Sequence, residues 1–203
     1  LKITDIKFVS TPDGEIKIYE KPQKDYPYVI GGDTAGGGSD QFTAQVINNV
    51  SGKQAAVLAR RFDEDLYARQ LYCLGMYYNT ALIAVETNFS THPVRELERL
   101  KYPKQYVRET TDTYTHTVKK SYGFQTNSKT RPLLIAELIA HMRDDIQNLT
   151  DKETAREMLT FIYNENRRPE ASSGAHDDLV IALGIAYFIR NAQSSSPPSP
   201  KID

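Results

Sequence analysis

The chain has 203 residues, of which 39% are hydrophobic and 25% charged, and its formal net charge is −1. This is enough for one domain with a sizeable core, and it excludes a collagen-like, coiled-coil or wholly disordered chain. The longest apolar run, residues 179–189, is too short to cross a bilayer, which takes about 20 residues. A single cysteine, Cys73, and the lack of a signal-peptide pattern favour a reducing, intracellular setting.

Charge is distributed unevenly along the chain. Residues 91–143 contain ten basic and five acidic side chains, whereas residues 144–170 contain four basic and seven acidic ones. A basic middle region is typical either of a surface that faces phosphate groups or of an ordinary mixed surface in solvent.

The two ends of the chain differ in composition from the middle. Residues 1–26 are polar and contain two prolines, so we expect a linker or a short hairpin there. Residues 193–203 hold four serines and three prolines and are expected to form a flexible tail. The folded domain is therefore predicted over residues 27–192.

Hydrophobic periodicity and turn residues define the elements between these ends. In chain order they predict strands over 28–30, 42–50 and 54–61, a helix over 63–79, a strand over 81–85, a helix over 91–100, a strand over 105–107 and a hairpin or loop over 110–122. A helix over 131–143, a helix or turn over 151–159, a strand over 161–163 and a helix over 177–191 follow. Glycine turns join the first three strands into an antiparallel meander, and the unbroken apolar strand 81–85 should be buried on both faces. We predict an α/β fold with a mixed β-sheet flanked by helices.

Acidic residues occupy three positions where a carboxylate is costly to bury. Asp33 follows the first apolar strand, Glu86 follows strand 81–85, and Asp177 and Asp178 begin the apolar last helix. If the two strands are neighbours, Asp33 and Glu86 emerge side by side at one end of the sheet. The last helix must then bring one of its aspartates to them.

Carboxylates that converge repel one another unless a cation or a proton intervenes. Oxygen ligands of this kind select Mg²⁺ or Mn²⁺, and two such ions about 3.5–4 Å apart are the usual device for hydrolysing phosphodiesters. Each position also has an ordinary structural explanation. Asp33 could form a turn, Glu86 an ion pair, and the two aspartates could stabilise a helix N-terminus, while His176 could cap that helix or lie in the core.

Four local motifs, in this order, resemble the C-terminal nuclease domain of the large terminase subunit of tailed phages. They are Gly32-Asp33-Thr34-Ala35-Gly36-Gly37-Gly38-Ser39-Asp40, Val85-Glu86-Thr87-Asn88, Gly123-Phe124-Gln125-Thr126 with Thr130-Arg131-Pro132, and Gly174-Ala175-His176-Asp177-Asp178-Leu179-Val180. The resemblance covers residues 27–192 and implies a ribonuclease H-like fold with an extra β-hairpin near the active site. It implies a metal-dependent endonuclease that cuts double-stranded concatemeric DNA during viral genome packaging, in the host cell cytoplasm.

The resemblance also assigns roles to individual residues. It makes Asp33, Glu86 and either Asp177 or Asp178 the catalytic residues and the ligands of two Mg²⁺ or Mn²⁺ ions. The auxiliary residues near the site would be Asp40 and His176. Residues 110–122 match the position of the β-hairpin that the family has near its active site. The side chains that would contact the DNA backbone, without reading its sequence, are Lys119, Lys120, Lys129 and Arg131.

Large terminases normally join this domain to an N-terminal packaging ATPase and act with a small terminase subunit and a portal. This chain lacks the phosphate-binding motif G-x-x-x-x-G-K-[ST], because Gly52-Lys53 is followed by Gln54 and has no upstream glycine at the required spacing. We therefore expect the nuclease half alone, with residues 1–26 as the end of an interdomain segment. Such a chain should cut DNA but not translocate it.

Three other classes of protein share some of these features. An actin, sugar-kinase or Hsp70-type ATP-binding domain also has an aspartate before a glycine turn, but it needs a second such loop and leaves Glu86 and the His176-Asp177-Asp178 string unexplained. A resolvase or transposase would share the fold and the metals but not the substrate. A non-catalytic module that docks on a portal or on DNA would not need all of the acids.

Overall fold

The structure is a computed structural model that describes residues 6–34, 36, 41–61, 63–111, 117–163, 169–172 and 176–196. The strands in these residues are β1 (Ile16–Ile18), β2 (Tyr28–Asp33), β3 (Phe42–Asn48), β4 (Gln54–Arg60), β5 (Leu82–Val85), β6 (Val107–Thr111), β7 (Val118–Tyr122), β8 (Phe161–Tyr163) and β9 (Pro169–Ala171). The helices are α1 (Glu64–Tyr77), α2 (His92–Arg99), α3 (Thr130–Asp145), α4 (Lys152–Thr160) and α5 (Asp178–Phe188), with the short 3-10 helices η1 (Ile146–Asn148) and η2 (Ile189–Ala192).

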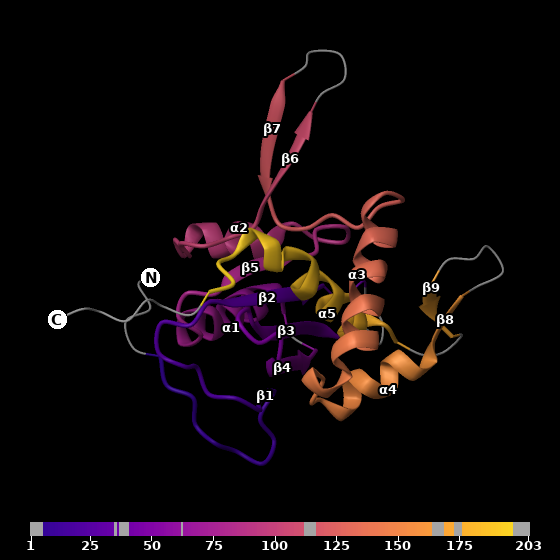
Figure 1. Cartoon of the computed structure of the whole chain (residues 1–203). Helices are drawn as coiled ribbons and strands as arrows, with labels where there is room; N and C mark the ends of the chain where they lie inside the picture. Colours follow the sequence, from indigo (N-terminus) through magenta and orange to yellow (C-terminus); the bar gives the residue numbers. More distant parts are fainter. Residues whose placement is uncertain are drawn as a thin grey trace.

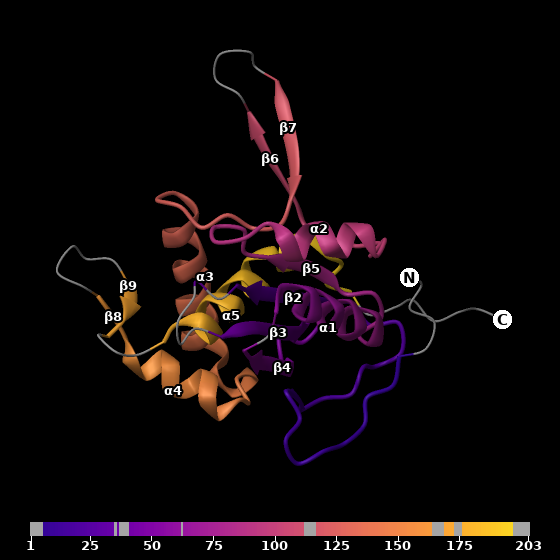
Figure 2. The ribbon, with the colours of Figure 1, turned by 180° about the vertical axis from the view of Figure 1, so that it is seen from behind.

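Five of the strands form a mixed sheet in the order β1-β4-β3-β2-β5 (Figure 1). Strands β2, β3 and β4 form the predicted antiparallel meander, and β5 joins β2 in parallel with Gly32 opposite Val85. Helices cover both faces, with α3 and α5 on one side and α1 and α2 on the other (Figure 2). The predicted α/β architecture of a mixed sheet flanked by helices is confirmed.

The core lies in two layers, one on each side of the sheet. On one side α1 and the residue after it contribute the fully buried stripe that helical spacing predicts, Tyr67, Leu71, Leu74 and Tyr78. On the other side the apolar helix α5 and one face of α3 pack against the sheet. Strand β5 supplies Ile83 to the first layer and Leu82 to the second, so it is buried on both faces as expected.

Helix α5 lies unusually close to β2 because of Gly31. A β-carbon at Gly31 would come within 2.2 Å of the main-chain oxygen of Ala182 and 2.3 Å of the amide nitrogen of Ala186. On the opposite side of the helix, a β-carbon at Gly184 would lie 2.3 Å from the Leu134 side chain of α3. Only glycine permits such approaches, so these two positions fix α5 between the sheet and α3.

The sheet extends into the segment that we expected to be a linker or a short hairpin. Strand β1 pairs with β4, with Ile16 opposite Leu58 and Ile18 opposite Ala56. The two isoleucines pack against the first core layer, and this burial is what orders the strand. A three-residue Ile-Lys-Ile pattern is too short to be distinguished from a polar linker in the sequence. Strand β9, which pairs with β8, was likewise not predicted.

A β-hairpin occupies the region that we predicted as a hairpin or loop. Strands β6 and β7 pair antiparallel, with Val107 opposite Tyr122, and they extend away from the body of the domain (Figures 1 and 2). Residues 112–116 lie outside the described residues. The separate strand predicted over 105–107 is wrong: Gln105 forms only an isolated bridge to Ile83.

Among the described residues, the helices are all too short or too polar to cross a membrane.

Gly31→Ala tests the close packing of α5 on the sheet. We expect the free energy of unfolding to fall by at least about 1–3 kcal/mol, the usual cost of overpacking a core, because the new methyl group would overlap main-chain atoms. Urea unfolding followed by circular dichroism measures the loss. Gly14→Ala is the control, because its β-carbon would lie 3.2 Å from a methyl group of Thr11 and should change stability by less than about 0.5 kcal/mol. Equal losses in the two variants would contradict the account.

Candidate active site

Asp33 and Glu86 emerge together at one end of the sheet. The parallel pairing of β2 with β5 continues past the strands, where the Glu86 amide donates a hydrogen bond to the Gly32 carbonyl at 2.8 Å. Both acids are buried, with exposed fractions of 6% for Asp33 and 5% for Glu86. Burial, and then the charge of Glu86 and a hydrogen bond with it, raise the pKa of Asp33 well above its usual range.

The start of α5 brings a third acid to this pair. The charge of Asp178 also contributes to the raised pKa of Asp33, and the Asp178 side chain is 15% exposed. Asp177, the residue before the helix, forms an ion pair with Arg131 at 3.2 Å. The sequence left open which of the two aspartates joins Asp33 and Glu86; both line the same cavity, and of the two only the charge of Asp178 acts on Asp33, whereas Asp177 pairs with Arg131.

These residues share one cavity of about 310 Å³. Asp33, Glu86, Asp177 and Asp178 all line it, together with Arg131, His176 and two threonines, Thr34 and Thr126. The hydroxyl oxygens of both threonines are buried and have no hydrogen-bond partner among the described residues. The site therefore combines closely spaced carboxylates with buried polar atoms that are left unsatisfied.

The carboxylate oxygens of the site are suitable ligands for a divalent cation. In this structure, however, the side chains are not arranged around a common point where an ion could bind. Nowhere in the described residues do three His, Cys, Asp or Glu side chains form a ready-made metal-binding group. Asp178 instead accepts a hydrogen bond from the Gln41 main-chain amide at 3.1 Å, the Asp33 carboxylate accepts one from the Thr34 main-chain amide at 2.8 Å, and Asp177 pairs with Arg131. Carboxylate oxygens are the ligands that Mg²⁺ prefers, so Asp33, Glu86 and Asp178 could hold an ion once their side chains turn toward it.

Hydrogen bonds from two elements, β3 and α4, hold the first turn of α5 in place. The Thr43 hydroxyl donates to the Asp178 carbonyl at 2.8 Å, and the Gln45 amide donates to the Leu179 carbonyl at 3.2 Å. The Leu179 amide donates to the Glu157 carboxylate of α4 at 2.9 Å. Glu157 therefore satisfies a helix N-terminal amide that would otherwise lack a partner, and this fixes the main chain that carries Asp178.

Glu157 is a residue of the site region that sequence reasoning missed. Burial raises its pKa to about 7, even though the Leu179 and Val180 amides act in the opposite direction. In the sequence, Glu157 is one of several charged residues in a short amphipathic helix. No local pattern indicates that this helix lies beside the start of α5.

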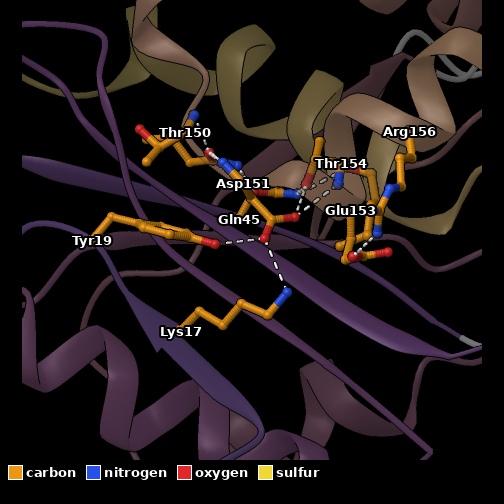
Figure 3. A network of polar contacts seen from close by, with 10 residues as sticks. Lys17, Tyr19, Gln45, Thr150, Asp151, Glu153, Thr154 and Arg156 are labelled. Carbon is orange, nitrogen blue, oxygen red and sulfur yellow. Dashed lines mark hydrogen bonds and ion pairs between the residues drawn. The ribbon is translucent and has the colours of Figure 1, made fainter.

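A buried polar network anchors α4, the helix that carries Glu157, to the sheet (Figure 3). Asp151 caps α4 by accepting a hydrogen bond from the Thr154 amide at 2.7 Å, and it also accepts from Tyr19 at 2.6 Å and Lys17 at 3.1 Å. Burial opposes ionisation of Asp151, but these bonds outweigh it and lower its pKa. Gln45 donates to the Thr154 hydroxyl at 2.9 Å, which ties the network to β3.

The other predicted site residues are placed as follows. His176 does not lie in the core: its side chain is 44% exposed, and its Nδ1 atom lies 4.0 Å from a carboxylate oxygen of Asp178. The residue at the N-cap position of α5 is Asp177. Asp40 lies outside the described residues. Arg131 lines the cavity, whereas the three predicted DNA-contacting lysines are exposed and do not line it, namely Lys119, Lys120 and Lys129.

The chain has the fold of the nuclease domains of phage large terminases. It is similar to the large terminase nuclease from thermophilic phage G20c, with a TM-score of 0.66, 18% identity and coverage of 93% of both chains. For a structure of the same nuclease with bound magnesium the TM-score is 0.68, again at 18% identity, covering 93% of this chain and 92% of that one. The Thermus phage P74-26 large terminase nuclease domain is similar with a TM-score of 0.67 and 19% identity, and the match covers 91% of this chain and 90% of that one. No family model and no curated protein sequence matches the chain.

Asp33→Asn tests whether the buried negative charge of Asp33, close to those of Glu86 and Asp178, lowers the stability of the fold. An acid whose pKa is higher in the folded than in the unfolded protein costs stability above its unfolded pKa, which is about 4 for aspartate. In EDTA at pH 7, this variant should therefore unfold at a higher temperature than the wild type. The gain should disappear below about pH 4, where Asp33 is protonated in both states.

Differential scanning calorimetry across this pH range makes the measurement. Asp144→Asn is the control, because Asp144 is exposed and pairs with its neighbour Arg143 at 2.8 Å; it should show no such gain. A lower unfolding temperature for Asp33→Asn at pH 7 would mean that the Asp33 charge stabilises the fold.

Proposed function

We propose that this chain is a metal-dependent endonuclease that cuts double-stranded DNA during phage genome packaging. The observation that carries the proposal is the buried Asp33–Glu86 pair with Asp178 beside it, in a fold shared with terminase nucleases. Three such acids cannot all be ionised in a buried site without a compensating cation. The G20c nuclease structures with bound magnesium, cobalt and zinc support divalent cations as that compensation.

In the proposed mechanism, Asp33, Glu86 and Asp178 hold two Mg²⁺ or Mn²⁺ ions. Bound cations of this kind activate a water molecule and stabilise the leaving oxygen of a phosphodiester. The chain's own contribution is to deliver the carboxylates from three rigid elements and to bury them, which strengthens their interaction with positive charge. We further propose that the fold is ribonuclease H-like and that the substrate is concatemeric DNA.

Asp177 has a different role in this proposal from Asp178. Its ion pair with Arg131 holds the guanidinium group at the cavity wall. From that position Arg131 can contact a phosphate of the substrate, and Asp177 would orient it. Asp40 and His176 remain proposed auxiliary residues near the site.

The hairpin is proposed to contact the DNA backbone through Lys119 and Lys120, and Lys129 at the start of α3 would add a further contact. The base of the hairpin is joined to the strand that carries Glu86. The Phe124 amide donates to the Val85 carbonyl at 2.8 Å, and Arg108 of β6 donates to the Thr87 hydroxyl at 2.9 Å. Phosphate contacts on the hairpin would therefore be placed in a fixed relation to the acids. Such contacts position a duplex without reading its sequence.

The family resemblance supports the remaining parts of the proposal. In a full packaging motor this domain would act with an ATPase domain, a small terminase subunit and a portal, in the host cell cytoplasm. The near-neutral charge of the chain predicts weak DNA binding by the domain alone, because non-specific affinity for DNA depends on basic residues.

Cleavage of supercoiled plasmid tests the proposed function. We expect the purified chain to cut in Mn²⁺ or Mg²⁺ and not in EDTA. Asp178→Asn should lose far more activity than Asp177→Asn, for which we expect a loss of about 10–100-fold, typical of residues that orient others. Asp144→Asn should cut like the wild type.

Two results would contradict this proposal. A folded chain that cuts with none of these cations would exclude the nuclease assignment. A strong preference for four-way junctions over linear duplex would favour the resolvase class instead.

A further inference from the structure

Two buried hydroxyl groups in the candidate active site have no hydrogen-bond partner within the part of the chain that the structure describes. They belong to Thr34, which is 2% exposed and follows Asp33 directly, and to Thr126, on the segment after the hairpin. Both residues line the cavity that holds the acids. Buried polar groups in proteins are almost always satisfied, so two such exceptions in one cavity require an explanation.

The threonines buried elsewhere in the same region are satisfied. Thr43, 1% exposed, donates to the Asp178 carbonyl at 2.8 Å. Thr154, fully buried, is bonded to Asp151 at 2.8 Å and to Gln45 at 2.9 Å. The unpaired hydroxyls among the described residues are thus confined to the cavity, where a ligand could supply the missing partner.

A phosphodiester is the ligand that would need these hydroxyls. The carboxylates around it accept hydrogen bonds but cannot donate them when ionised, and they repel a phosphate. Hydrogen-bond donors in the cavity wall would therefore help to hold the phosphate beside the proposed cations and Arg131. One such donor, the Asn88 side-chain amide, already donates to the Thr126 carbonyl at 2.6 Å.

We propose that the Thr34 hydroxyl, with that of Thr126, donates a hydrogen bond to a non-bridging oxygen of the bound phosphodiester. This proposal rests on the nuclease function proposed above. The Thr34 amide donates to the Asp33 carboxylate at 2.8 Å, which fixes the main chain at this point. Rotation about the Cα–Cβ bond turns the hydroxyl toward the cavity without moving that main chain.

Thr34→Val separates a ligand contact from a structural role, because valine has the same shape and lacks only the hydroxyl. Removing an unpaired buried hydroxyl should leave the protein at least as stable as the wild type in urea unfolding with EDTA. Thr43→Val is the matched comparison and should lower the unfolding midpoint, because it removes a hydrogen bond that the Thr43 hydroxyl makes to the Asp178 carbonyl. A Thr34→Val variant as destabilised as Thr43→Val would overturn the proposal.

Two functional readouts complete the test. The rate of plasmid cutting in Mn²⁺ should fall about 10- to 100-fold in Thr34→Val, the effect expected when one hydrogen bond to a charged group is lost. Affinity for a duplex DNA in Ca²⁺, measured by fluorescence anisotropy, should also fall. Thr34→Ser keeps the hydroxyl and should retain most of both activities. Unchanged cutting and binding in Thr34→Val would overturn the proposal.

The outcomes also separate this proposal from the proposed function. A wild type that binds duplex DNA in Ca²⁺ but cuts with no cation would refute the nuclease function, and weaker binding by Thr34→Val would still support the contact. A wild type that neither cuts nor binds would refute both.

Discussion

The contact between the main chains of α5 and β2 at Gly31 determines where the acidic residues meet. With no side chain at that position, the helix lies directly on the strand, and its first residue, Asp178, reaches the ends of β2 and β5. Asp33 and Glu86 are buried at those ends. The same packing that stabilises the apolar core therefore brings carboxylates together at a cost in stability, a pattern that is typical of functional sites.

A second set of interactions fixes the exact position of Asp178 within this arrangement. Glu157 holds the Leu179 amide from α4, and Thr43 holds the Asp178 carbonyl from β3. Helix α4 is in turn fixed to the sheet through Asp151. This carboxylate accepts hydrogen bonds from Lys17 and Tyr19 of the β1 segment and from the Thr154 main-chain amide of α4. The N-terminal segment thus contributes indirectly to the order of the site, although it lies far from Asp178 in the sequence.

The sequence predicted the features that depend on local pattern, and it missed those that depend on packing. The α1 stripe and the two-sided burial of β5 follow from periodicity, and the acids at strand ends were identified from their positions. Asp177 and Asp178 could not be separated, because adjacent residues at a helix start differ mainly in direction, which packing sets. Strand β1 was missed because three residues carry too weak a pattern, and Glu157 because its contact with Leu179 spans two separate helices.

The most direct test of the account is a crystal structure of the wild-type chain soaked in Mn²⁺, with anomalous diffraction used to locate the ions. We predict two anomalous peaks in the cavity, bounded by the carboxylates of Asp33, Glu86 and Asp178, with Asp177 still paired to Arg131. A fully ordered site with no manganese at these carboxylates would contradict the central claim that the buried acids are arranged to bind divalent cations.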